Sequence, residues 1–396
     1  MSSRNENLDK GKVKITSLVS FLMGFSQAML IYVMAYYFKL ASGTENVGPF
    51  YFISFGIILI IFLNLHKLIR ALGKSNVFYF SILATVVISS LLVFLEPSYL
   101  GIALLMTYVI FINIAWTSLD VILESFSTDR MSGRIRGAHL TIVNFGYLLG
   151  PFLSTRILGK FDFKGIFLFL LVFNALVLVV SLLGLRDVNH RFDVKLKALD
   201  LIKKFLRRKE LMKIYYISFC LDFFYALVVI YTSIYLLDRG ISWEKIGIIF
   251  TIMLIPFVIF QYPIGFLADK KMGEKELLVF ALAVMGISTG IVYFIDSSSV
   301  LVWAIVLFCT RIGASMVEIL RDSYFYKKID GHDVDVINFF RTTMPAGYIL
   351  ATVVSFALLM IFPTKIVFLV AAAVAFSGLY PAFRLIDSKS ERESIL

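Results

Sequence analysis

Long apolar runs separated by short polar stretches dominate this 396-residue chain. A helix needs about 20 apolar residues to cross a bilayer core about 30 Å thick. Six such runs lie near residues 14–40, 48–66, 76–95, 99–126, 137–158 and 164–185, and six more near 213–237, 244–268, 276–295, 299–327, 336–361 and 364–386. The pattern predicts an all-α membrane protein of twelve transmembrane helices, with a six-helix half over 1–185, a linker over 186–212 and a second half over 213–396.

Composition and charge support this interpretation. Hydrophobic residues make up 59% of the chain and charged residues 16%, against about a quarter charged in soluble domains. The net charge of +11 comes from basic residues spread between the apolar runs, which argues against a nucleic-acid partner. Of the 38 Lys and Arg residues, 28 fall in alternate segments that include both termini, and the positive-inside rule makes those segments cytoplasmic. We expect a multi-pass protein of the plasma membrane, in contact with the lipid bilayer.

The central linker has its own periodicity. In VKLKALDLIKKFLRRKELMK, apolar residues such as Val194 and Phe205 recur at helical spacing against lysines and arginines. The pattern predicts a basic amphipathic helix at the cytoplasmic membrane surface. A tether between the halves is the preferred interpretation, and a regulatory or partner-binding segment is the alternative.

The two halves repeat each other at an offset of 198 residues. Asn113, Thr117, Asp120 and Glu124 are spaced 4, 3 and 4 apart, so they share one face of a helix. Arg311, Ser315, Glu318 and Asp322 occupy the same positions in the second half. A polar face inside lipid must turn toward protein or a water-filled cavity. Internal duplication of this kind is typical of transporters.

A motif after the eighth run carries a family resemblance. The stretch GFLADKKMGEK resembles the signature loop of the major facilitator superfamily in order and spacing. Its matching residues are Gly265, Asp269, Lys270, Gly273 and Lys275. The resemblance implies alternating access between two six-helix halves, with Asp269 as a lock on one conformation. The corresponding loop of the first half has Ile69 at the position of this Asp.

Two further stretches are similar to motifs of the same family. DRMSGRIRG resembles the link between helices 4 and 5, and GYLLGP resembles a helix-5 motif of proton-coupled exporters. The residues concerned are Asp129, Arg136, Gly137, Gly146, Gly150 and Pro151. Ser154 and Thr155 replace the Gly-Gly pair expected after the second motif. Gly-Pro inside a span also serves as a kink or packing site, and that alternative stays open.

The resemblance also implies that helices 1, 4, 7 and 10 line a central cavity. The candidates for the substrate and proton site are Gln27, Asn113, Thr117, Asp120, Asp222, Tyr225, Arg311, Ser315 and Glu318. A second group near the cytoplasmic helix ends is expected to form ion pairs that fasten helices: Glu124, Arg321, Asp322 and Arg341. Asp120 and Glu318 are equivalent in the repeat, and we expect them to carry the proton.

The energy source follows from what the sequence contains. The chain has no G-x-x-x-x-G-K-[ST] loop for ATP, and its four histidines lack metal-ligand spacing, so we expect neither a cofactor nor a metal. We predict a secondary active transporter, monomeric and proton-coupled, that moves a small molecule. Efflux of an amphipathic solute is preferred over the alternative, uptake of an anionic solute by symport. A membrane-embedded enzyme and a non-transporting receptor are alternatives from other classes; clustered catalytic residues at a membrane face would favour the enzyme.

Overall fold

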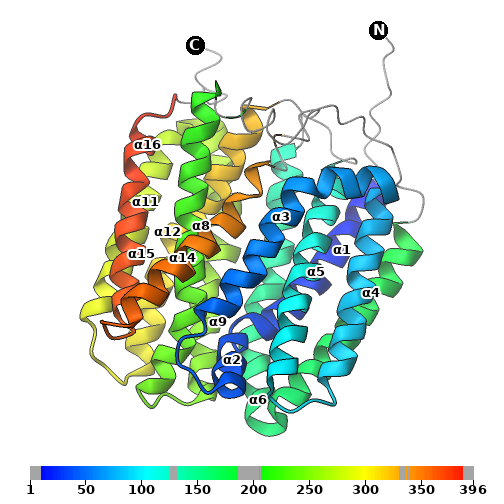
Figure 1. Ribbon diagram of the computed structural model, residues 1–396. Coiled ribbons are helices and arrows are strands. Elements are labelled where there is room, and N and C mark those ends of the chain that lie inside the picture. The colour runs from blue at the N-terminus through cyan, green and yellow to red at the C-terminus, as the bar shows by residue number, and fades with distance from the viewer. Residues whose placement is uncertain are drawn as a thin grey trace.

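The computed structural model describes residues 10–124, 132–185, 205, 207–329, 336 and 339–386. In these ranges the chain forms helices that run side by side as one bundle, without strands (Figure 1). Large apolar side chains cover the outside, and Ile60, Phe80, Phe280 and Leu301 are all more than half exposed. Such a surface is unfavourable in water and suits contact with lipid.

The first half contains the expected spans with two differences in their bounds. Its helices are α1 (Lys10–Ile31), α2 (Met34–Ser42), α3 (Gly48–Leu72), α4 (Lys74–Leu92), α5 (Tyr99–Glu124) and α6 (Ser132–Gly184). The first expected span is divided between α1 and α2. The fifth and sixth form one element, α6, which turns at Asp162 with φ 52° and ψ −161°. Its two arms therefore cross the bundle separately.

The second half is interrupted at more places than expected. Its elements are α8 (Lys209–Asp238), α9 (Trp243–Ile259), α10 (Gln261–Leu267), the π-helix η1 (Ala268–Met272), α11 (Lys275–Phe294), α12 (Val300–Lys327), α14 (Thr343–Leu359), α15 (Ile366–Ser377) and α16 (Leu379–Phe383). Prolines account for the interruptions, because a proline cannot donate to the carbonyl four residues earlier and its ring clashes there. Pro263 and Pro381 follow the ends of α9 and α15 by four residues. Pro345 lies in the first turn of α14, and a turn at Arg341 and Thr342 separates α14 from the helical residues Phe339 and Phe340.

The number of crossings agrees with the sequence prediction. In the described part of the chain, ten helical segments are long and apolar enough to cross a membrane. Counting the two arms of α6 separately and adding α14, which has 17 residues, gives twelve. The predicted all-α bundle is therefore confirmed.

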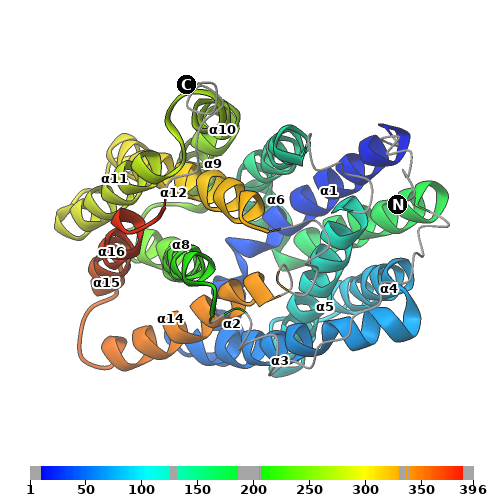
Figure 2. The same ribbon diagram turned by 90° about the horizontal axis from the view of Figure 1, so that it is seen from above.

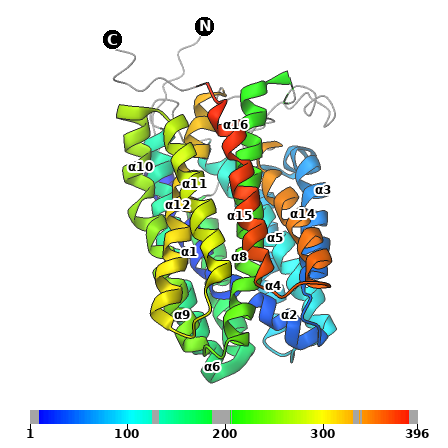
Figure 3. The same cartoon turned by 90° about the vertical axis from the view of Figure 1, so that its left-hand side faces the viewer.

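The two halves meet along two helix pairs, α6 with α9 and α3 with α14 (Figure 2). In the second half, α11 packs on α15, and both lie with α16 on the outer face (Figure 3). α1 begins and α16 ends at the same end of the bundle, called here the terminal end (Figure 1). Residues 186–204 and 206, most of the predicted linker, lie outside the described residues. Phe205 is buried, with its ring 4.5 Å from that of Phe339.

Contacts between the halves gather at the end opposite the terminal end. Tyr36 of α2 meets Trp243 of α9 with ring centroids 5.1 Å apart. Lys39 of α2 forms a 3.5 Å ion pair with Asp238 of α8. Gly247 of α9 approaches α6 so closely that an added Cβ would lie 3.1 Å from the Pro151 carbonyl oxygen. The halves are thus in contact at this opposite end.

Candidate functional site

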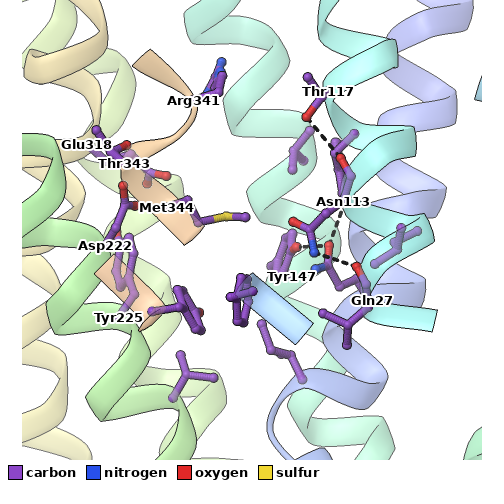
Figure 4. Close-up of a pocket in the computed structure, with 18 of the residues that line it drawn as sticks. Gln27, Asn113, Thr117, Tyr147, Asp222, Tyr225, Glu318, Arg341, Thr343 and Met344 are labelled. Carbon is purple, nitrogen blue, oxygen red and sulfur yellow. Dashed lines mark hydrogen bonds between the residues drawn. The ribbon is translucent and has the colours of Figure 1, made fainter. Parts of the chain in front are cut away.

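A cavity of about 370 Å³ lies between the two halves. Residues of α1, α2, α3, α5 and α6 line one wall, and residues of α8, α9, α12 and α14 line the other (Figure 4). The side chains of Asp120 and Arg341, toward the terminal end, are 28% and 25% exposed. Tyr51, at the other limit of the cavity, is 3% exposed. The cavity therefore opens toward the terminal end and is closed at the opposite end.

The first-half wall holds four of the predicted candidates, Gln27, Asn113, Thr117 and Asp120. The Gln27 side-chain oxygen accepts hydrogen bonds from Trp116 Nε1 and the Tyr147 hydroxyl, both at 2.6 Å. The Asn113 amide donates to the Val109 carbonyl, and the Thr117 hydroxyl donates to the Asn113 carbonyl. Because two donors occupy the Gln27 oxygen, its NH₂ group is left to donate to a ligand.

The second-half wall is held by a buried ion pair between α8 and α12. Arg321 Nη1 lies 3.3 Å from each carboxylate oxygen of Asp222 and 2.6 Å from the Ser218 hydroxyl. Asp322 lies 3.6 Å from Arg321 Nε. Both partners of the Asp222 pair are less than a tenth exposed. Arg321 and Asp322 were expected in ion pairs that fasten helices near their cytoplasmic ends. Arg321 joins α12 to α8 through Asp222, Asp322 contacts Arg321 within α12, and both also line the cavity.

A second ion pair connects the two halves. Arg341, just before α14, lies 3.1 Å from Asp120 of α5. Arg341 was expected among the helix-end pairs, and its partner comes from the other half of the molecule. Because this pair is partly exposed at the open side of the cavity, a conformational change that separates the halves there must break it.

Glu318 has a different environment. Its carboxylate accepts a 2.9 Å hydrogen bond from the Gln261 side-chain amide, and the Gln261 oxygen accepts a 2.8 Å bond from Asn144. This chain runs from α12 through α10 to α6, and so from one half to the other. Among the described residues Glu318 forms no ion pair, in contrast to Asp120 and Asp222.

Two predicted candidates do not lie on the cavity surface. Ser315 is buried and donates to the Ile312 carbonyl of its own helix. Arg311 is 1% exposed, and its guanidinium lies 5.1 Å from the Phe224 ring centroid and 5.8 Å from that of Tyr225. Tyr225 does line the cavity, as predicted, and separates Arg311 from it.

The motif residues belong to helix contacts and turns outside the cavity. Gly150 lets α6 approach α1, since an added Cβ would lie 2.3 Å from the Ala28 Cβ. Gly146 lies on the same contact, Gly265 faces Ile319, and Lys270 lies over the Phe266 ring. Gly273 has a φ of 72° and precedes Lys275, where α11 begins. Asp129 and the side chains of Glu124, Arg136 and Asp269 lie outside the described residues.

Sequence reasoning missed Asn144, Gln261 and Tyr147. The first two are amides inside apolar spans, and this was a usable signal because an amide in lipid needs a partner. Tyr147 carries no such signal, since tyrosine is common in apolar runs. Its role as a donor to Gln27 emerges only from the packing of α6 against α1.

A twelve-helix bundle with a cavity between two halves is the architecture of a membrane transport protein. The sequence profile of the Major Facilitator Superfamily matches residues 16–329 and 244–395, and the chain belongs to this superfamily. Its structure is similar to the crystal structure of the nucleoside transporter NupG, with a TM-score of 0.70, 12% identity, and coverage of 96% of this chain and 100% of that one. A mutant NupG structure gives a TM-score of 0.70, 13% identity, and coverage of 95% and 100%. Comparison with curated proteins gives no match. Family and fold assign the chain to the secondary transporters and not to the enzymes.

Proposed function

We propose that this protein is a proton-coupled secondary transporter that moves a small organic solute by alternating access. The positive-inside rule supports a cytoplasmic terminal end, with both chain termini on that side of the plasma membrane. The described conformation is then inward-facing. One chain supplies both walls of the cavity, which fits a monomer as the working unit.

The environment of Glu318 carries the proposal of proton coupling. A carboxylate held beside an arginine keeps its charge, whereas one without a cation binds a proton more readily. Asp120 and Asp222 have arginine partners, while Glu318 has a neutral amide. Protonation removes its negative charge and weakens its hold on Gln261, since charge-assisted hydrogen bonds are the stronger ones. Because Gln261 also binds Asn144 of the other half, the proton is linked to the contact between the halves.

Asp120 takes a different role in this proposal. Its ion pair with Arg341 joins the halves at the open side of the cavity, so we assign to it control of the opening rather than proton transfer. Sequence reasoning had assigned the proton to both acids. The unequal partners of Asp120 and Glu318 are the reason to separate their roles.

Different features of the cavity favour efflux and uptake. The aromatic lining of the cavity and the Gly150-Pro151 sequence favour efflux of an amphipathic solute, our first choice. The buried Arg311 favours a second candidate, symport of a proton with an anion, because a cation near the cavity attracts anionic solutes. Both candidates use the same proton site.

Transport in proteoliposomes tests the proposal. A labelled solute that raises the melting temperature of the purified protein would be offered under a pH gradient. We expect Glu318→Gln to retain solute binding and solute exchange but to lose accumulation driven by the gradient. Glu244→Gln, an exposed acid at the start of α9, is the matched control. Gradient-driven accumulation at the wild-type level in Glu318→Gln would exclude Glu318 as the proton carrier.

A further inference from the structure

We infer that Arg311 and Tyr225 form an anion-binding end of the substrate site, and that the transported solute is a small aromatic monoanion of the carboxylate class. This inference rests on the proposed transport function and adds the chemical class of the solute.

Arg311 is a buried cation that forms no ion pair with the residues that the structure describes. It lies about 16 Å along α12 from the first residue of that helix, which places it near the middle of the membrane. Its side chain is among the largest that are fully buried, and within the described ranges neither Nε nor Nη1 has a hydrogen-bond partner. An uncompensated charge at this depth is strongly unfavourable. A protein retains such a charge when a ligand supplies the missing negative charge.

The other cavity arginines show the contrast. Arg321 has Asp222, Asp322 and Ser218 around it, and Arg341 has Asp120. In the described part of the chain, Arg311 forms no ion pair with an acid. Its nearest neighbours include the faces of Phe224 and Tyr225, which stabilise a cation only partly.

Tyr225 connects Arg311 to the cavity. Its ring lines the cavity on the same wall as Asp222 and Glu318 (Figure 4), and its buried hydroxyl has no hydrogen-bond partner among the described residues. A guanidinium and a phenol hydroxyl both donate hydrogen bonds, and together they suit a carboxylate. For Arg311 to reach a solute, the Tyr225 side chain would have to rotate when the solute binds, because Arg311 itself does not line the cavity.

The other residues that line the cavity determine the shape and chemistry of the uncharged part of the solute. Eleven of the thirty-three lining residues are aromatic. Phe55 and Tyr348 form a close ring pair with centroids 4.0 Å apart, and Tyr225 faces Phe257 at 6.3 Å. Aromatic faces bind planar rings by offset or edge contacts. A volume of about 370 Å³ limits the solute to one or two rings.

Binding of matched ligand pairs tests the assignment. The purified full-length protein would be titrated with benzoate, phenylacetate and indole-3-acetate, and with their neutral primary amides, by calorimetry and thermal shift. We expect the carboxylates to bind and the amides to bind at least roughly tenfold more weakly, since the amides lack the charge. Arg311→Gln should weaken carboxylate binding by roughly 100-fold and Tyr225→Phe by roughly tenfold.

Two further measurements separate a binding role from a structural one. Arg384→Gln is the matched control, because Arg384 also lies over a tyrosine ring, 4.3 Å from that of Tyr380, but is exposed. It should leave binding unchanged. Without ligand, Arg311→Gln should melt at a higher temperature than wild type, because an unpaired buried charge is removed. A lower melting temperature would identify Arg311 as a structural residue.

The outcomes are distinct from those of the proton test. Equal binding of amides and carboxylates, no binding of any carboxylate, or full binding by Arg311→Gln overturns the assignment. These titrations use no membrane and no gradient, so their failure leaves proton coupling through Glu318 standing. Failure of the Glu318→Gln transport test leaves the anion site standing.

Discussion

Gly247→Ala is expected to move the protein away from the described conformation, in which the halves touch at the end opposite the termini. Gly247 lies on α9 where the halves touch at the opposite end. A Cβ at this position would lie 2.1 Å from the Thr155 hydroxyl oxygen and 3.1 Å from the Pro151 carbonyl oxygen, whereas ordinary contact begins at 3.4 Å. α6 and α9 must therefore separate, or Thr155 must rotate.

The magnitude follows from these contacts. The Thr155 hydroxyl donates a 2.9 Å hydrogen bond to the Pro151 carbonyl, and rotation would lose it at a cost of about 1 kcal/mol. The Pro151 carbonyl oxygen would still lie too close to the new methyl group. Together, the lost hydrogen bond and the overpacking should cost about 1–3 kcal/mol. We expect the halves to separate at this contact in the alternative conformation, so the ratio of the two conformations should change by about 5-fold to 150-fold.

Distances between spin labels measure this ratio. Cysteines at Thr44 and Ser298, exposed at the opposite end in different halves, would be labelled in a background without Cys220 and Cys309. We expect Gly247→Ala to gain a population with longer distances. Gly56→Ala is the control, since a Cβ at this position would meet no described atom within 4 Å other than its own helix backbone and chain neighbours. A distribution equal to wild type would refute the idea that α6 and α9 separate during transport.

Three other perturbations follow from the same structure. Arg321→Gln leaves Asp222 and Asp322 buried without a cation and should lower the stability of the bundle by about 3–5 kcal/mol. The double variant Arg321→Gln/Asp222→Asn should recover part of this loss. Equal melting temperatures for wild type and Arg321→Gln would contradict the prediction. Asp269→Asn should change the balance between the two openings without unfolding the protein, and unchanged label distances would exclude a lock at Asp269. In intact cells a membrane-impermeant maleimide should label a cysteine at Thr44 but not one at Met272, and the reverse pattern would invert the proposed orientation.

The sequence was sufficient to predict the fold because each membrane crossing is specified locally. Run length gives the number of spans, and the family resemblance gives their arrangement in two halves. In the second half the bounds differ where Pro263 and Pro381 interrupt a run. In the first half they differ between Ile31 and Met34 and at Asp162, where no proline stands. The prolines were visible in the sequence, but apolar composition alone hides their effect on the helix.

The site was predictable only in part, because helical periodicity gives a face and not a partner. Asn113, Thr117, Asp120 and Glu318 do lie on the cavity, as their spacing indicated. Two contacts join residues more than 50 positions apart in the sequence. The ion pair links Asp120 of the first half to Arg341 of the second. The hydrogen-bonded chain runs from Asn144 of the first half through Gln261 to Glu318 of the second. Nothing local in the sequence indicates such contacts. The roles of these residues stay predictions until transport is measured.

Solute-induced proton movement tests the central claim most directly. Proteoliposomes loaded with a pH-sensitive dye, at equal pH on both sides, would receive a solute that stabilises the purified protein. We expect a pH change in the lumen with wild type, and none with empty liposomes or with Glu318→Gln. Passage of the solute through the wild-type protein without any movement of protons would contradict it.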